Sequence, residues 1–205
     1  YIENEANLSA LGEKTFFHSY PSLININVHA GVGMGIILDQ HLYTGLNGYA
    51  GEFGHTIIEP DGRPCPCGNR GCIEQYASER AILKEYAART QQDTVTIDSF
   101  LRAYQEQKPE ALEMMDLFVK YMSIGINNII NTFNIDLIVL NSSFSNYINQ
   151  RIVAYLARHQ NRDCRIIPSR LQDTSGLMGG IRLSAEGFLD IKHLKIRVPF
   201  SDNLR

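Results

Sequence analysis

The chain has 205 residues, of which 44% are hydrophobic and 20% are charged, and its formal net charge is -3. This composition excludes a disordered chain and provides enough apolar residues for one good core or two small lobes. The charge lacks the basic excess of a surface that neutralises phosphates, which argues against DNA binding by this chain itself.

The chain also lacks the patterns of membrane and secreted proteins. No apolar run approaches the roughly 20 residues needed to span a bilayer, and the opening YIENEANLSALGEK has no signal-peptide pattern. We therefore expect a cytoplasmic protein with no membrane partner. The chain begins with Tyr1, not Met, and starts at once on a polar motif typical of a strand end. We interpret it as the C-terminal fragment of a longer protein.

The hydrophobic pattern predicts strands that alternate with helices. Residues 23–38 read as two β-branched strand segments bent around Gly31, Gly33 and Gly35, and a hairpin turn, short strands and loops follow up to residue 62. Helices are expected over 72–90, 95–107, 109–131, 146–158 and 175–188, and strands over 136–141, of the parallel type, and 164–169. This alternation is typical of an α/β fold.

Three of the four cysteines fall within eight residues. Their spacing is Cys65-x-Cys67-x4-Cys72, and His55 lies ten residues before the first. A Cys3His ligand set suits tetrahedral zinc, and four protein ligands leave no open position, so the zinc would be structural. The alternatives are a reduced cluster and a disulfide, and the odd number of cysteines argues against a disulfide framework. The spacing predicts a zinc-binding loop over 55–72.

Glu52 and Glu74 flank this loop. If one ring nitrogen of His55 binds zinc, the other carries a proton and becomes an oriented hydrogen-bond donor. Such a donor beside two carboxylates could bind the hydroxyl groups of a polyol. The alternative for both glutamates is a solvated loop or helix face.

These motifs resemble the signature of the ROK family, which contains sugar kinases, transcriptional repressors and open reading frames of unknown role. The specific part is Glu52-x-Gly54-His55 followed by CPCGNRGCIEQYAS over 65–78. ENEAN (3–7) and ALGE (10–13) are similar to the family's E-N-D-A-N and A-L-G-E stretch. AGVGMGIILDQHLYTGLNGYAGEFGH (30–55) and SGLMGGIRL (175–183) extend the resemblance over essentially the whole chain.

The resemblance implies an actin-like, ribonuclease H-like fold of two lobes with a sugar in the cleft. Residues 1–205 would form a ROK-type sugar-binding domain, mainly the larger second lobe plus the hinge. The implied zinc ligands are His55, Cys65, Cys67 and Cys72. The implied sugar-binding residues are Asn4, Glu5, Glu52, His55 and Glu74. For Asn4 and Glu5, helix capping is the alternative role.

Three departures from the family's kinases predict a protein without kinase activity, and one of them is Val32, which stands where the kinases usually carry a hydroxyl residue. Glu5 stands where the kinases carry an aspartate as general base, and misplacing that carboxylate by more than about 1 Å can cost about 100-fold in rate. The turn after the strand at 136–141 normally carries a run of glycines facing the adenosine. Here that run is lost at 141–143, where side chains occupy the space. Because phosphoryl transfer depends on precise positioning, these losses together should leave little phosphoryl-transfer activity.

The favoured hypothesis is the sugar-sensing, effector-binding and dimerisation domain of a ROK transcriptional repressor, most like the xylose-responsive branch. Its partners would be a small sugar, a second copy, and operator DNA bound by a helix-turn-helix upstream of this chain. The apolar segment 121–133 is either a dimer interface or buried core. The alternative function is an ATP-dependent ROK kinase acting on a hexose or an N-acetylamino sugar.

Overall fold

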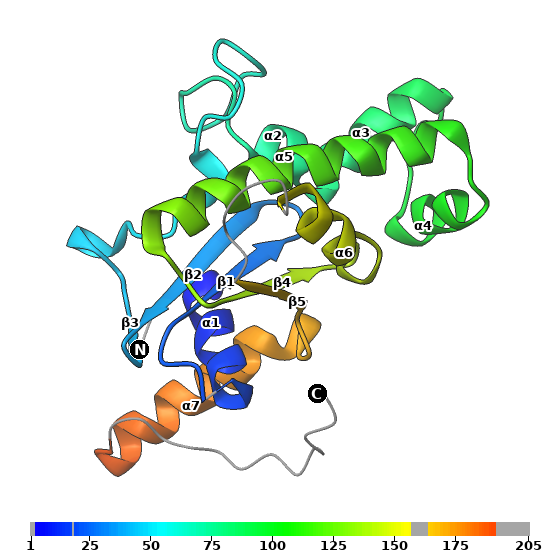
Figure 1. Cartoon of the computed structure of the whole chain (residues 1–205). Helices are drawn as coiled ribbons and strands as arrows, with labels where there is room; N and C mark the ends of the chain where they lie inside the picture. Colours follow the sequence, from blue (N-terminus) through cyan, green and yellow to red (C-terminus); the bar gives the residue numbers. More distant parts are fainter. Residues whose placement is uncertain (1–2, 18, 157–163, 192–205) are drawn as a thin grey trace.

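The computed structural model describes residues 3–17, 19–156 and 164–191. In these residues, helices cover both faces of a central sheet (Figure 1). The strands are β1 (Leu23–Val28), β2 (Val32–Leu38), β3 (His41–Leu42), β4 (Leu137–Ser142) and β5 (Arg165–Pro168). The helices are α1 (Glu5–Phe16), α2 (Glu74–Ala77), α3 (Glu79–Thr90), α4 (Ile97–Gln105), α5 (Pro109–Phe133), α6 (Ser145–Leu156) and α7 (Ser175–Leu189). Three short 3-10 helices are η1 (Leu46–Gly48), η2 (Phe53–His55) and η3 (Gln172–Thr174).

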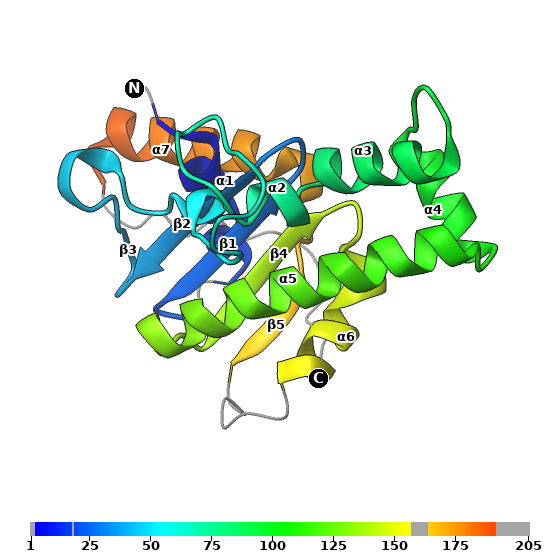
Figure 2. The ribbon, with the colours of Figure 1, turned by 90° about the horizontal axis from the view of Figure 1, so that it is seen from above.

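The sheet is mixed, with the strand order β3-β2-β1-β4-β5. β1, β2 and β3 pair antiparallel, whereas β4 pairs parallel with both β1 and β5. The parallel strand expected over 136–141 is therefore confirmed. Helices α1 and α7 lie against one face and α5 against the other (Figures 1 and 2). None of the helices that the structure describes is long and apolar enough to cross a membrane.

Helix α5 supplies much of the core on its face of the sheet. Its buried side chains include Met122, Ile126, Ile129 and Ile130, which belong to the same cluster as the inward residues of β1 and β4. The buried-core interpretation of segment 121–133 is therefore confirmed. Its interpretation as a dimer interface is wrong for these four side chains, because the chain's own sheet covers them.

Three details differ from the sequence prediction. The expected helix over 72–90 breaks at Ser78, whose extended backbone (φ -93°, ψ 157°) separates α2 from α3 and whose hydroxyl accepts from the Ala81 N–H. The predicted bend at 23–38 is confined to residues 29–31, and Gly33 and Gly35 lie inside β2. Helix α1 was not predicted from the hydrophobic pattern. The expected end of α6, residues 157–158, lies outside the described residues.

Gly33 and Gly35 let α1 approach the backbone of β2. A Cβ at residue 33 would lie 3.1 Å from the Ala6 Cβ, and one at residue 35 would overlap the Ala6 carbonyl oxygen. Interiors pack at nearly crystalline density, so an added methyl group here has no free volume to enter. The two glycines therefore fix the distance of α1 from the sheet.

Helices α1 and α7 also contact each other closely, because each contributes a glycine to the crossing. A Cβ at Gly12 would overlap the Ser175 carbonyl oxygen, and one at Gly179 would overlap the Leu8 carbonyl oxygen. Gly180, the next residue, faces open space. The α1–α7 pair is thus joined backbone to backbone.

We expect Gly179→Ala to lower the free energy of unfolding by about 3 kcal/mol, because the new methyl group meets backbone that has no side chain to rotate away. Gly180→Ala is the matched control. It adds the same methyl group on the same helix and should stabilise the protein by about 0.5 kcal/mol through helix propensity. Urea denaturation measures both, and equal effects would contradict the packing described here.

Candidate metal centre and cleft

The loop after η2 carries the predicted metal ligands. η2 places His55, and the segment that follows doubles back through two isolated β-bridges, Ile57 with Cys72 and Pro64 with Arg70. At the return, Gly71 has a φ of +82°, and a Cβ there would overlap the Glu59 carbonyl oxygen. Glycine adopts this conformation without strain, and it permits the close approach of residue 71 to Glu59 where the loop closes.

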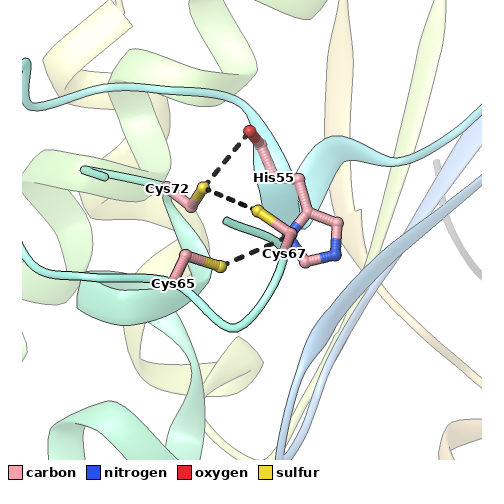
Figure 3. A group of neighbouring side chains, drawn as sticks. All are labelled: His55, Cys65, Cys67 and Cys72. Atoms are coloured by element: carbon pink, nitrogen blue, oxygen red, sulfur yellow. Dashed lines mark hydrogen bonds between the residues drawn. The ribbon is translucent and has the colours of Figure 1, made fainter. Parts of the chain in front are cut away.

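The four predicted ligand side chains converge on one point (Figure 3). His55, Cys65, Cys67 and Cys72 each offer a ligand atom, and these atoms all lie within 4.8 Å of one another. The His55 Nδ1 to Cys65 Sγ distance is 3.5 Å, and the Cys67 Sγ to Cys72 Sγ distance is 3.7 Å. Two sulfurs held about 2.3 Å from one tetrahedral ion would lie about 3.8 Å apart. The arrangement therefore fits one metal ion and no disulfide, since a disulfide needs sulfurs about 2.05 Å apart.

The cysteines differ in their affinity for protons. Burial, reinforced by the neighbouring thiols of Cys65 and Cys67, raises the pKa of Cys72 to about 12. A hydrogen bond from the backbone N–H of Asn69 is the main interaction that lowers the pKa of the exposed Cys67. A thiol buried in this way stays protonated near neutral pH, and a metal ion must displace its proton to bind. Metal binding at this site should therefore release protons.

His55 is oriented with its two ring nitrogens in different environments. Nδ1 faces the cysteines, and Nε2 lies 3.8 Å from the Glu52 Oε2. If Nδ1 binds the metal, Nε2 keeps a proton and is a donor directed toward a half-exposed carboxylate. This is the pairing expected from the sequence for His55 and Glu52.

Glu74 is directed toward the sheet. Its Oε2 accepts from the Val32 N–H at 3.1 Å, and its Oε1 accepts from Arg80 at 3.2 Å. A Cβ on Gly31 would lie only 2.8 Å from the Glu74 Oε2. The carboxylate therefore lies against the turn that joins β1 to β2.

The elements that carry the predicted sugar-binding residues meet at the start of β2. In α1, the Asn4 side chain caps the helix by accepting from the Ala6 N–H at 2.8 Å, and Glu5 is the first helical residue. The expected capping role of Asn4 is confirmed. η2 contacts the same strand, because a Cβ on Gly54 would overlap the Val32 carbonyl oxygen. α1, η2 and α2 thus all contact residues 31–35.

Two adjoining pockets lie at the ends of β1 and β4. The first has a volume of about 480 Å³ and is lined by Glu3, Glu5 and Leu8 from the start of α1 and by residues of η3 and α7. The second, of about 240 Å³, lies beside the turn after β4 and the start of α6. Both are lined by His29, Asn141, Gln172 and Asp173, so they form one continuous cleft. Glu5 therefore faces this cleft.

Sequence reasoning did not identify His29 or Glu79, which lies behind the pocket linings, and it considered Asn141 only as part of the lost glycine run at 141–143. His29 ends the β1 side of the turn and lines both pockets, and Asn141 is buried and donates to the Ser175 Oγ at 3.2 Å and to the Gln172 carbonyl at 3.0 Å. Glu79 begins α3, and its carboxylate is buried behind His29. His29 and Asn141 could have been found as polar residues at strand ends. Glu79 gave no signal, because the predicted helix ran through it.

The backbone N–H groups of residues 142–144, at the end of β4 and in the turn after it, are bonded within the protein. The Ser142 N–H donates to the Ser145 Oγ at 3.0 Å, and the Phe144 N–H donates to the Ser142 Oγ at 3.1 Å. Between them, the Ser143 N–H donates to the Glu79 Oε1 at 2.8 Å. Side chains from the turn and from α3 therefore use all three donors.

The model of the ROK family matches residues 1–186. The chain belongs to the ROK family. A xylose repressor of Bacillus spizizenii is 34% identical over 200 residues, which cover 93% of this chain and 52% of the repressor. The chain thus spans about half the length of this curated ROK relative.

Solved ROK structures share the fold. A ROK family glucokinase from Streptomyces griseus, in complex with glucose and AMPPNP, superposes with a TM-score of 0.81 at 26% identity, covering 89% of this chain and 67% of the glucokinase. A ROK family transcriptional regulator, a homologue of the E. coli MLC protein, gives 0.76 at 28% identity and covers 86% of this chain and 49% of the regulator. The expected actin-like fold is therefore confirmed, with repressors and kinases both among the ROK relatives.

We expect the intact protein to bind one zinc ion per chain, and Cys72→Ser to lower its zinc affinity more than about 100-fold, since losing even an outer-shell partner costs about 10–100-fold. Metal analysis after gel filtration and competition with a chromogenic chelator measure this. Cys164→Ser is the control, because Cys164 lies outside the loop and should leave zinc binding unchanged. Full zinc binding by Cys72→Ser would exclude the predicted ligand set.

Proposed function

We propose that the chain is the effector-binding part of a cytoplasmic ROK transcriptional repressor that senses a small sugar. The observation that carries this proposal is that the N–H groups of residues 142–144, at the end of β4 and in the turn after it, are bonded within the protein. A nucleotide at these three residues would find no backbone donor free. The similarity to a xylose repressor makes xylose the first sugar to test.

The proposed metal is zinc, and its role is structural. The ligand set is three cysteines and one histidine, and four protein ligands leave no position for a substrate. The loop they close has few apolar residues with which to hold itself together. The metal would fix the ends of the loop, from which Glu52 and Glu74 extend.

The proposed sugar contacts are Asn4, Glu5, Glu52, His55 and Glu74. Carboxylates accept hydrogen bonds from hydroxyl groups, and the His55 Nε2–H would donate one in return. Glu5 would act from the hinge, and Glu52, His55 and Glu74 from the larger lobe. Sugar binding would favour one closure angle of the two lobes, since a ligand shifts a conformational equilibrium through its differential contacts.

Lobe closure would affect DNA binding through a dimer. We propose a homodimer in which a helix-turn-helix upstream of this chain binds each half of the operator, so that a change in closure angle changes the spacing of the two DNA-binding units. The net charge of -3 agrees with a chain that does not itself contact phosphates.

The alternative function is a ROK sugar kinase, and the similarity to the Streptomyces griseus glucokinase favours it. Two features oppose it. Glu5 stands at the position of the general base, one methylene longer than the aspartate of the kinases, and the turn after β4 is closed. We therefore place the kinase second.

The first test of the repressor proposal measures operator binding by the intact protein with and without sugars. We expect xylose or a related sugar to weaken operator binding at least about tenfold, which corresponds to about 1.4 kcal/mol of coupling between the two sites. Glu52→Gln should keep operator affinity and lose the sugar response, while Glu85→Gln, a partly exposed α3 variant outside both pockets, should keep both. The kinase would be favoured instead if the intact protein hydrolysed ATP in a sugar-dependent manner and no pentose or hexose changed its operator affinity.

A second test links the metal to the sugar. If zinc fixes the loop that carries Glu52 and His55, the chelated protein should lose sugar binding, measured by isothermal titration calorimetry, and regain it when zinc is restored. Circular dichroism monitors whether the sheet and helices survive chelation. Unchanged sugar affinity in metal-free protein would break the link.

A further inference from the structure

Glu79 is an acidic residue in an unusual environment. It is the first residue of α3, and only 7% of it is exposed. Buried carboxylates are rare unless they are paired or hydrogen-bonded. The partners of the Glu79 carboxylate therefore have to account for its burial.

The Glu79 carboxylate joins two turns that border the cleft. Its Oε1 accepts from the Ser143 N–H at 2.8 Å and from the Ser142 Oγ at 3.2 Å, both in the turn after β4. Its Oε2 lies 3.9 Å from the Nδ1 of His29, in the turn after β1. The Glu79 backbone N–H also donates to the His29 carbonyl at 2.9 Å, which fixes α3 to the same turn.

This position is the one that an anion would take. The Ser143 N–H lies two residues before α6, a helix of 12 residues whose dipole attracts negative charge toward its N-terminal end. Glu79 supplies that negative charge from within the chain. The neighbouring donors at residues 142 and 144 are already bonded to serine hydroxyls.

The rest of the cleft reinforces this charge. Glu3, Glu5 and Asp173 line the larger pocket, and Asp98 lines the smaller one. No lysine or arginine is among the described residues that line either pocket. A phosphate-bearing ligand would bring like charges together, which strongly disfavours binding, whereas a neutral polyol meets hydroxyl, amide and carboxylate partners.

We propose that Glu79 determines the ligand specificity of the cleft: its carboxylate occupies the Ser143 N–H and places a negative charge beside the cleft, so that the cleft excludes nucleotides and admits uncharged, polyhydroxylated ligands. This inference deepens the proposed function and rests on it, because only a protein that does not use ATP gains from such exclusion. Glu79 would thus be the side chain that separates this cleft from one able to hold a nucleotide.

The test compares ADP binding by the intact protein and three variants in magnesium-containing buffer, using isothermal titration calorimetry. Glu79→Ala removes the charge and frees the Ser143 N–H, so we expect its ADP affinity to exceed that of the wild type by about tenfold or more. Glu79→Gln keeps a hydrogen-bond acceptor but removes the charge, and should lie between them. Glu85→Gln, which removes a partly exposed charge from the same helix outside both pockets, should match the wild type.

Thermal melting shows which variants are folded, and Glu79→Gln keeps the proposal testable if Glu79→Ala does not fold. ADP affinity that is the same in the wild type and in the folded Glu79 variants, whether measurable or absent in all of them, would overturn the inference. Operator release by sugar, measured on the wild type, tests the proposed function separately. Wild-type protein that releases DNA while its Glu79 variants gain no ADP binding would remove this inference alone.

Discussion

The contact of three helical elements with the first half of β2 determines how the rest of the site is arranged. Glycines make this contact possible, because a side chain on Gly33 or Gly35 would collide with α1, and one on Gly54 would collide with the strand itself. Glu5, Glu52 and Glu74 come from separate stretches of the chain. Van der Waals contact with one strand sets their relative positions, and packed interiors deform little.

Two carboxylates near each other in sequence fix the turns after β1 and β4. Glu74 in α2 accepts from the Val32 N–H, and Glu79 in α3 accepts from the Ser143 N–H. Ser78 lies between them with an extended backbone, which turns the chain so that the two side chains reach different turns. The break between α2 and α3 therefore lets each carboxylate bind its own turn. In one continuous helix, helical geometry would fix the position of Glu79 relative to Glu74. Charged hydrogen bonds to backbone N–H groups are among the stronger ones, which suits a border that must keep its shape.

The metal centre is joined directly to this border. Cys72 is buried and precedes Glu74 by two residues, and His55 lies next to Gly54, which contacts β2. An ion at the four ligands would thus hold both ends of a polar loop at the points where the loop meets the strand. The scaffold resembles those of ROK repressors and ROK kinases alike. Function in such a family is decided by a few side chains at the cleft, and the fold leaves it open.

The sequence alone determined the local chemistry. The ligand spacing, the α/β alternation and the parallel strand at β4 depend on near neighbours and on hydrophobic periodicity, and all three can be read without coordinates. Only the tertiary structure decided the features that depend on long-range contacts. Gly33 and Gly35 lie inside a strand under α1, and residues 121–133 belong to the core. The Glu79 carboxylate reaches the Ser143 N–H across 64 residues of sequence. Periodicity predicted a continuous helix through Ser78, because local propensity carries no information about a backbone N–H that folding brings to a carboxylate from another part of the chain.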